Sequence, residues 1–116
     1  MIEMLDQSRE NVLGFRIGGT ITAEEEEKWI EMFDAPLSKY DKLNILIELD
    51  KHTGWTLKAA FEDYRWVSKH AKNIDKLAVV CESKVWEWLI TMDSKLLRID
   101  EKHFSDIDEA WDYVLA

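Results

Sequence analysis

One set of side chains in this sequence could carry out nucleophilic catalysis. Cys81 would be the nucleophile, His52 its base, and Asp50 the group that orients the base. A thiolate attacks efficiently only when a base such as imidazole lies within hydrogen-bond reach, so the fold would have to bring these residues together. A lone cysteine at the end of a buried strand is more often a small apolar residue than a nucleophile. We therefore expect no catalytic residue and no enzymatic activity.

Binding of a small molecule is the second chemistry that these positions allow. Polar and aromatic side chains follow two apolar segments, Leu43–Leu49 and Leu77–Val80. In open α/β sheets, ligands bind beyond the carboxyl ends of the strands, where helix N-termini offer unpaired N–H groups. A crevice here would grip a small apolar or lipid-like molecule through its indoles, whereas the alternative is that the tryptophans merely close the end of the core. The predicted ligand-binding residues are Asp50, His52, Thr53, Trp55, Cys81, Ser83 and Trp86.

A metal site is not predicted. Asp50, His52, Cys81 and Glu82 could be assembled around an ion, but structural zinc prefers several Cys or His at short fixed spacing, and that pattern is absent. The other histidines, His70 and His103, are expected to meet solvent or to form local hydrogen bonds. We expect neither a metal nor another cofactor.

The elements that must position these residues follow from the hydrophobic pattern and from capping residues. Thr22 with Glu25, and Ser105 with Asp108, form capping boxes that predict helix starts. The resulting order, β-β-α-β-α-β-α-β-α, predicts one α/β domain over residues 1–116, with an N-terminal hairpin and parallel central strands in a mixed sheet. The predicted strands are Ile2–Leu5, Val12–Ile17, Leu43–Leu49, Lys76–Cys81 and Leu97–Ile99, and helices are expected from Thr22, Thr56, Ser83 and Ser105. Pro36 is expected to end the first helical pattern.

The helix from Thr56 to Ala71 has apolar residues on more than one side. Helical spacing places one apolar stripe toward the core, formed by Leu57, Ala60, Phe61, Tyr64, Val67 and Ala71. Ala59, Trp66 and His70 then face outward, and a large exposed indole suggests an interface. We expect these three residues to form a homodimer contact or a patch for a regulatory partner. The alternative is that Trp66 is an ordinary exposed apolar residue.

Glu48 interrupts the apolar run Leu43–Leu49. A buried carboxylate without a partner is costly, so a donor is expected beside it. Arg16, on the neighbouring N-terminal strand, is the predicted partner and would make Glu48 structural. The alternative is that Glu48 lines a pocket as a polar anchor.

Charge limits the choice of partners. The 116 residues include 24 Asp and Glu against 15 Lys and Arg, for a formal net charge of −9. Such a chain repels phosphate backbones, and its basic residues are scattered singly along the sequence, so nucleic acid is not expected to bind. The acidic run Glu24–Glu27 is expected to be a solvated helix start, where carboxylates suit the positive end of the helix dipole.

Cysteine usage and hydropathy indicate a compartment. The single cysteine excludes an internal disulfide, and the first residues lack the basic and long apolar regions of a secretion signal. No apolar run approaches the roughly 20 residues that span a bilayer. We expect a cytoplasmic protein without transmembrane insertion.

Several segments in this order carry a family resemblance. They are Asn11-Val-Leu-Gly-Phe-Arg, Thr22-Ala-Glu-Glu, Leu46-Ile-Glu-Leu-Asp50, Gly54-Trp55-Thr56, Leu77-Ala-Val-Val and Trp86-Glu-Trp88. Together they resemble the SpoIIAA-like proteins of bacteria, which are related in fold to the STAS domain and grouped with Sec14-type lipid-binding domains. The specificity lies in the combination and order of these pieces, which cover nearly the whole chain.

The resemblance implies a mixed-sheet α/β domain that works without catalysis, as a regulatory or ligand-sensing module. In the sporulation regulators, a serine near the start of the helix after the central strand is phosphorylated by an anti-sigma factor with kinase activity. Thr53 and Thr56 occupy that neighbourhood here and are the candidate phosphorylation sites. The paired Asp-Ser of those regulators is absent, so the resemblance implies the position but not the recognition sequence.

Overall fold

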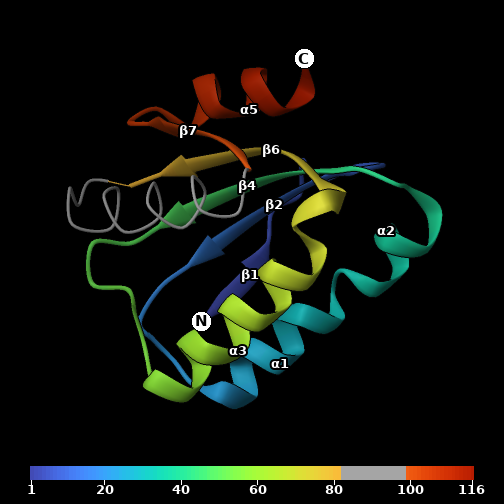
Figure 1. Cartoon of the computed structure of the whole chain (residues 1–116). Coiled ribbons are helices and arrows are strands. Elements are labelled where there is room, and N and C mark those ends of the chain that lie inside the picture. The colour runs from blue at the N-terminus through green and yellow to red at the C-terminus, as the bar shows by residue number, and fades with distance from the viewer. Residues whose placement is uncertain (82–98) are drawn as a thin grey trace.

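A mixed β-sheet lies at the centre of the computed structural model, which describes residues 1–81 and 99–116 (Figure 1). Its strands, in spatial order, are β1 (Ile2–Met4), β2 (Val12–Ile17), β4 (Leu43–Leu49), β6 (Ile74–Val80) and β7 (Asp100–Phe104). β1 pairs antiparallel with β2, and each of the other neighbouring pairs is parallel. The predicted N-terminal hairpin and parallel central strands are therefore confirmed.

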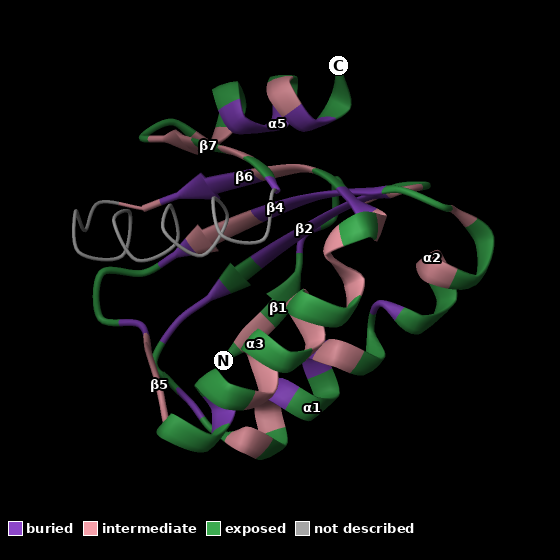
Figure 2. Cartoon of the chain, viewed as in Figure 1, coloured by how far each residue is buried: buried purple, intermediate pink, exposed green. Residues whose placement is uncertain are grey.

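Helices cover both faces of this sheet (Figure 1). One face is covered by α1 (Ala23–Glu31), α2 (Asp34–Lys39) and α3 (Leu57–His70), which ends in a 3₁₀ turn (Ala71–Asn73), and the other by α5 (Ile107–Leu115). The central strand β4 supplies both cores, since Ile45 packs on the α1 and α3 side and Leu46 on the α5 side. Burial on both faces explains why the sequence of β4 is nearly continuously apolar (Figure 2).

A second, two-stranded sheet joins the loops that precede α1 and α3. β3 (Thr20–Ile21) pairs in parallel with β5 (Gly54–Trp55), and the Thr56 N–H donates to the Ile21 carbonyl at 3.0 Å. The sequence pattern did not predict this pairing because each strand has only two residues. It fixes where α1 and α3 begin relative to each other.

The helix starts at Thr22 and Thr56 agree with the prediction, and the predicted cap of α5 differs. The hydroxyls of Thr22 and Thr56 accept hydrogen bonds from the backbone of Glu25 and Ala59, at 3.3 and 3.2 Å. At α5 the cap is Asp106, whose carboxylate accepts from Asp108 N–H at 2.9 Å. The predicted capping box of Ser105 with Asp108 was therefore wrong by one residue.

Two boundaries also differ from the sequence prediction. Pro36 does not end the helical region but lies in the first turn of α2, where its missing N–H breaks no helical hydrogen bond. The last strand is β7, which begins at Asp100, after the predicted strand Leu97–Ile99. Leu97 lies outside the described residues, as does the helix predicted from Ser83.

The α5 side of the sheet depends on one glycine. A Cβ atom added at Gly14 of β2 would lie 2.4 Å from the indole of Trp111, closer than real Cβ atoms approach other groups. Gly14 therefore permits the indole to rest on the sheet. Ala110 and Val114 of the same helix are fully buried beside it.

Candidate functional site

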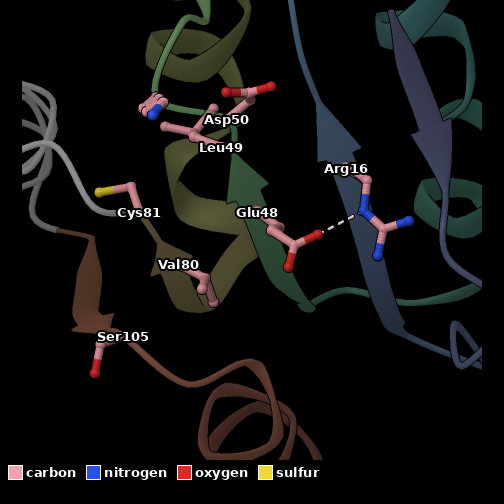
Figure 3. Close-up of a pocket in the computed structure, with 8 residues that line it drawn as sticks. Arg16, Glu48, Leu49, Asp50, Val80, Cys81 and Ser105 are labelled. Carbon is pink, nitrogen blue, oxygen red and sulfur yellow. Dashed lines mark hydrogen bonds and ion pairs between the residues drawn. The ribbon is translucent and has the colours of Figure 1, made fainter.

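A pocket of about 410 Å³ opens at the carboxyl ends of β4 and β6 (Figure 3). The described residues that line it are Arg16, Glu48, Leu49, Asp50, Lys51, Val80, Cys81 and Ser105. The two adjacent parallel strands thus bring Asp50 and Cys81 to the same hollow, as their positions at the strand ends predicted. Two cations and two carboxylates lie among these residues, so the hollow is more polar than the predicted crevice.

Two of the residues that line this pocket, Arg16 and Glu48, belong to an ion-pair row that crosses three strands. Arg16 Nε donates to Glu48 Oε1 at 2.6 Å (Figure 3). Arg16 Nη1 donates to Glu3 Oε1 at 3.1 Å. Glu3, Arg16 and Glu48 are cross-strand neighbours in register on β1, β2 and β4. The hydrogen bond and charge of Glu48 are the main causes that raise the pKa of Arg16. The predicted Arg16–Glu48 pair is confirmed, and Glu48 also lines the pocket.

Three other residues predicted to bind a ligand, His52, Thr53 and Trp55, are not among the described residues that line this pocket. His52 is exposed and is not among the described residues that line the pocket. Thr53 is buried, and its hydroxyl donates to the Ile17 carbonyl at 3.0 Å. Trp55 turns toward α1, where its indole N–H donates to Glu26 Oε2 at 3.2 Å. The β3–β5 pairing places Trp55 beside the helices, and the expected role of this residue in ligand binding stays a prediction. Ser83 and Trp86 lie outside the described residues.

A buried carboxyl, which the sequence did not predict, lies between α1 and α3. Glu26 is 0% exposed, although the run Glu24–Glu27 was expected to be solvated. The pKa of Glu26 is raised to about 9, mainly by burial and then by a hydrogen bond to Asp63 of α3 and its charge, against the opposing hydrogen bond from Trp55. Glu26 precedes Trp29 by three residues, so helical spacing could have placed it on the core-facing side.

The orientation of α3 differs from the prediction along most of the helix, although Val67 and Ala71 pack against the core as expected. Ala59 is 0% exposed, and the ring of Trp66 packs against Phe33 of the α1–α2 junction, with centroids 4.6 Å apart. His70 stacks on Trp66 in turn, at 4.7 Å. The predicted outward patch of Ala59, Trp66 and His70 was therefore wrong. The physical reason is that small Ala59 lets the helix approach closely, while the Trp66 indole fills the space beside Phe33.

Three of the exposed large apolar side chains among the described residues, including the two most exposed, lie on the other face of α3. Leu57 is 92% exposed, Phe61 61% and Tyr64 43%. Ala60 is exposed between them. These four residues, which we call the α3 stripe, have the i, i+3, i+4, i+7 spacing of one helical face.

Comparisons with known proteins agree with this architecture. A family model described as SpoIIAA-like matches residues 12–115. The chain belongs to the SpoIIAA-like family. A crystal structure from Shewanella loihica PV-4, an uncharacterised protein of the DUF3478 family with a SpoIIAA-like fold, matches with a TM-score of 0.79 and 25% identity. That match covers 97% of this chain and 93% of the other. No curated protein matches the chain.

The two threonines near the start of α3 differ in accessibility in this SpoIIAA-like protein. Thr53 is 4% exposed and its hydroxyl is bound to the backbone of β2, so a kinase could not reach it without local opening. Thr56 is half-buried, and its hydroxyl caps α3. A phosphoryl group on Thr56 would have to replace this cap.

Two further features of this SpoIIAA-like fold concern metals and membranes. Within residues 1–81 and 99–116, no three His, Cys, Asp or Glu side chains are grouped so that they could hold a metal ion. Across the same residues, no helix has the length and apolar character that a membrane crossing requires. His103, in β7, pairs locally with Glu101, as expected for a histidine with a structural role.

Proposed function

We propose that this SpoIIAA-like protein is a non-catalytic regulatory module that binds another protein through the α3 stripe. The observation that supports this function is the exposure of Leu57, Phe61 and Tyr64 on one face of one helix. Singly exposed apolar residues are ordinary, but contiguous exposed apolar side chains mark interaction sites. Two turns of helix that present such anchors can pack against an apolar helix face of a partner protein, ridges into grooves.

The inner face of α3 supports this function because it fixes the stripe in place. Ala59 and Trp66 pack into the core shared with α1, and the Thr56 side chain caps the first turn. The β3–β5 pairing sets the position at which the helix starts. A partner would therefore meet a preorganised surface and would not have to order the helix when it binds.

The polar groups near Cys81 favour a non-catalytic role. His52, the only histidine that the sequence offered as a base for this thiol, is not among the described residues that line the pocket beside Cys81. The family resemblance points to a regulatory domain as well. Binding by α3 requires no chemistry at that pocket.

Site-specific photo-crosslinking in the native host tests this function. Benzoylphenylalanine in place of Phe61 should form a covalent adduct with a protein of defined mass, and Leu57→Asp in the same chain should abolish the adduct. Leu115 of α5 is also exposed, at 40%, and the same crosslinker at this position serves as a matched control. Equal adducts from both positions, or none from position 61, would overturn the proposal.

The second candidate function is binding of a small molecule in the pocket between β4 and β6. The specific observation is that Asp50 and Cys81 meet there with Lys51 and Arg16. The apolar contribution comes mainly from Leu49 and Val80, so the pocket suits a small amphiphilic molecule with a charged group better than a wholly apolar one.

Native mass spectrometry of the freshly purified protein tests this second function. A retained molecule should add a fixed mass, and Ser105→Phe, a substitution at the exposed rim, should remove that mass by filling the pocket. Lys102→Phe, at an exposed position that does not line the pocket, is the control. A mass equal to that of the bare chain would count against the ligand.

A further inference from the structure

We infer that the partner of the α3 stripe presents an acidic amphipathic helix. This inference rests on the proposed function and adds the chemistry of the partner. It starts from three cations, Lys58, Arg65 and Lys69, that line one edge of the stripe. We call them the basic row.

The basic row is continuous on the helix surface although its members are scattered in the sequence. At about 100° per residue, positions 58, 65 and 69 fall within an arc of about 40°. This arc lies next to Phe61, and the Arg65 guanidinium carbon is 5.8 Å from the centroid of the Phe61 ring. All three residues of the basic row are exposed. A partner that covers the stripe would therefore meet these cations along one side.

The described residues leave the basic row without acidic partners. Their ion pairs involve other groups, and none includes Lys58, Arg65 or Lys69. The nearest acids on α3 are half-buried: Glu62 lies on the core side of the row, and Asp63 faces Glu26. The row thus contrasts with the rest of a chain whose formal net charge is −9.

Carboxylates along the edge of a partner helix would complement this row. Rim charges contribute modestly to affinity, but they steer association and fix the orientation of the partner. The apolar side chains of the partner helix would cover the stripe, and its acidic edge would determine the direction in which the partner helix lies. The apolar stripe and the basic row would therefore both be complemented by one partner, an amphipathic helix with an acidic edge.

A second copy of this chain fits the surface less well. If two α3 helices packed antiparallel about a twofold axis, the basic row of one would face the basic row of the other, and like charges would oppose the contact. A parallel pair would place the row beside Val67 and Asp63, which are half-buried. Neither arrangement supplies an exposed acidic edge.

An anionic membrane is also a weaker fit. Polybasic surfaces that bind such membranes usually contain four to eight cations, whereas the row has three. The net charge of −9 adds a long-range repulsion from anionic lipid. A protein helix avoids that penalty because its acidic groups can be confined to the edge that meets the row.

Three synthetic helical peptides test the inference. Each has leucines at i, i+3, i+4 and i+7, and they differ only in whether Glu, Gln or Lys flanks these anchors. In fluorescence anisotropy at low salt, the Glu peptide should bind about tenfold more tightly than the Gln peptide, and the Lys peptide least tightly. Added salt should reduce the difference between the peptides.

A charge-reversed variant and a matched control sharpen this result. Lys58→Glu, Arg65→Glu and Lys69→Glu together should reverse the order of the three peptides. Lys39→Glu, Lys72→Glu and Lys102→Glu change the net charge equally at exposed positions away from the row, and should preserve the order. Circular dichroism and the melting temperature would verify that both variants fold.

The failures of the two proposals are distinguishable. If the three peptides bind equally, and Leu57→Ser with Phe61→Ser removes binding, the acidic partner is overturned while docking on the stripe stands. If no peptide binds, the acidic helix is overturned, and the crosslinking from position 61 still tests the function independently. Binding to vesicles of phosphatidylserine and phosphatidylcholine instead of the peptides would assign the surface to lipid and overturn both.

Discussion

The two helical layers on either side of the sheet are built in different ways. α5 buries Ala110, Trp111 and Val114 against the strands, and Gly14 makes room for the indole. α3 is longer, with 14 residues, but Ala59 is its only fully buried side chain. The α5 layer thus contributes mainly packing to the fold.

The layer of α1 and α3 retains features that cost stability. It buries the Glu26 carboxyl beside Asp63 and leaves Leu57 and Phe61 in contact with water. Neither feature improves packing, and stability is small enough that such costs are felt. Both layers pack a hydrophobic core against the sheet, and under the proposed function the outer face of α3 also serves for binding. We expect the following substitutions to separate the two layers.

The largest effect on stability is expected at the centre of the α5 layer. Trp111→Ala should lower the free energy of unfolding by about 3–5 kcal/mol, because it removes buried contacts and leaves a cavity above Gly14. Chemical denaturation followed by far-UV circular dichroism would measure the loss. A change in the free energy of unfolding below about 1 kcal/mol would mean that the packing of α5 contributes little to stability.

The buried carboxyl of the other layer should produce an effect of opposite sign. The pKa of Glu26 is raised to about 9 in the folded protein, above its ordinary value of 4.5, so the native state holds a proton that the unfolded chain releases. Its contribution to stability is complete below about pH 4.5 and is lost as the pH rises toward 9, at about 1.4 kcal/mol per pH unit. Glu26→Gln should therefore raise stability at pH 7 by about 3 kcal/mol.

The pH dependence of that substitution is the decisive measurement. The difference in unfolding free energy between Glu26→Gln and the unaltered protein should grow from pH 5 to pH 8. Glu27→Gln, at the exposed neighbouring position, is the matched control and should show little change over the same range. A difference that stays constant with pH would show that Glu26 is ionised in the folded state.

A smaller loss is expected where the α5 layer meets the sheet. Gly14→Ala places a methyl group where only 2.4 Å separates it from the Trp111 ring, so the indole or the helix must shift. We expect a loss of about 1–3 kcal/mol, as is usual for overpacked cores. Gly54→Ala, where an added Cβ would meet nothing within 4 Å, is the control in the same denaturation assay. Equal stabilities for the two variants would contradict the close packing of α5.

The sequence predicted the sheet well because its signals were local. The apolar run of β4, the capping hydroxyl of Thr22 and the helix start at Thr56 each depend on a few adjacent residues, and they were predicted correctly. The convergence of Asp50 and Cys81 followed from two adjacent parallel strands. In each case, one element or one pairing rule was sufficient.

The rotation of α3 could not be read in the same way. Apolar residues lie on two sides of this helix, and the side with more of them, including Leu57 and Phe61, was expected inside. Which side packs depends on contacts from distant parts of the chain, namely the β3–β5 pairing and Phe33 beside Trp66. The same long-range pairing turned Trp55 away from the pocket.

The spacing of charged residues along the sequence did not reveal where they lie around each helix. Lys58, Arg65 and Lys69 looked scattered, yet helical spacing gathers them on one side of α3. Glu24–Glu27 looked uniformly solvated, yet the same spacing puts Glu26 on the side of Trp29. The environment of a charged residue on a helix is thus better predicted from its angular position on that helix than from the number of charges near it in the sequence.

The smallest effect on stability is expected on the α3 stripe, and it separates the two layers most clearly. Leu57→Ser combined with Phe61→Ser should change the free energy of unfolding by no more than about 0.5 kcal/mol, because these side chains are mostly in water already. The same variant should lose the crosslinked partner, with the photo-reactive residue moved to the Tyr64 position. Leu115→Ser, on the exposed end of α5, should retain it.

A large loss of stability in the double variant would make the stripe part of the core, and retained crosslinking would show that the partner binds elsewhere. A small loss of stability together with a lost partner is expected of a surface maintained for binding, since packing gives no reason to keep a leucine that is 92% exposed.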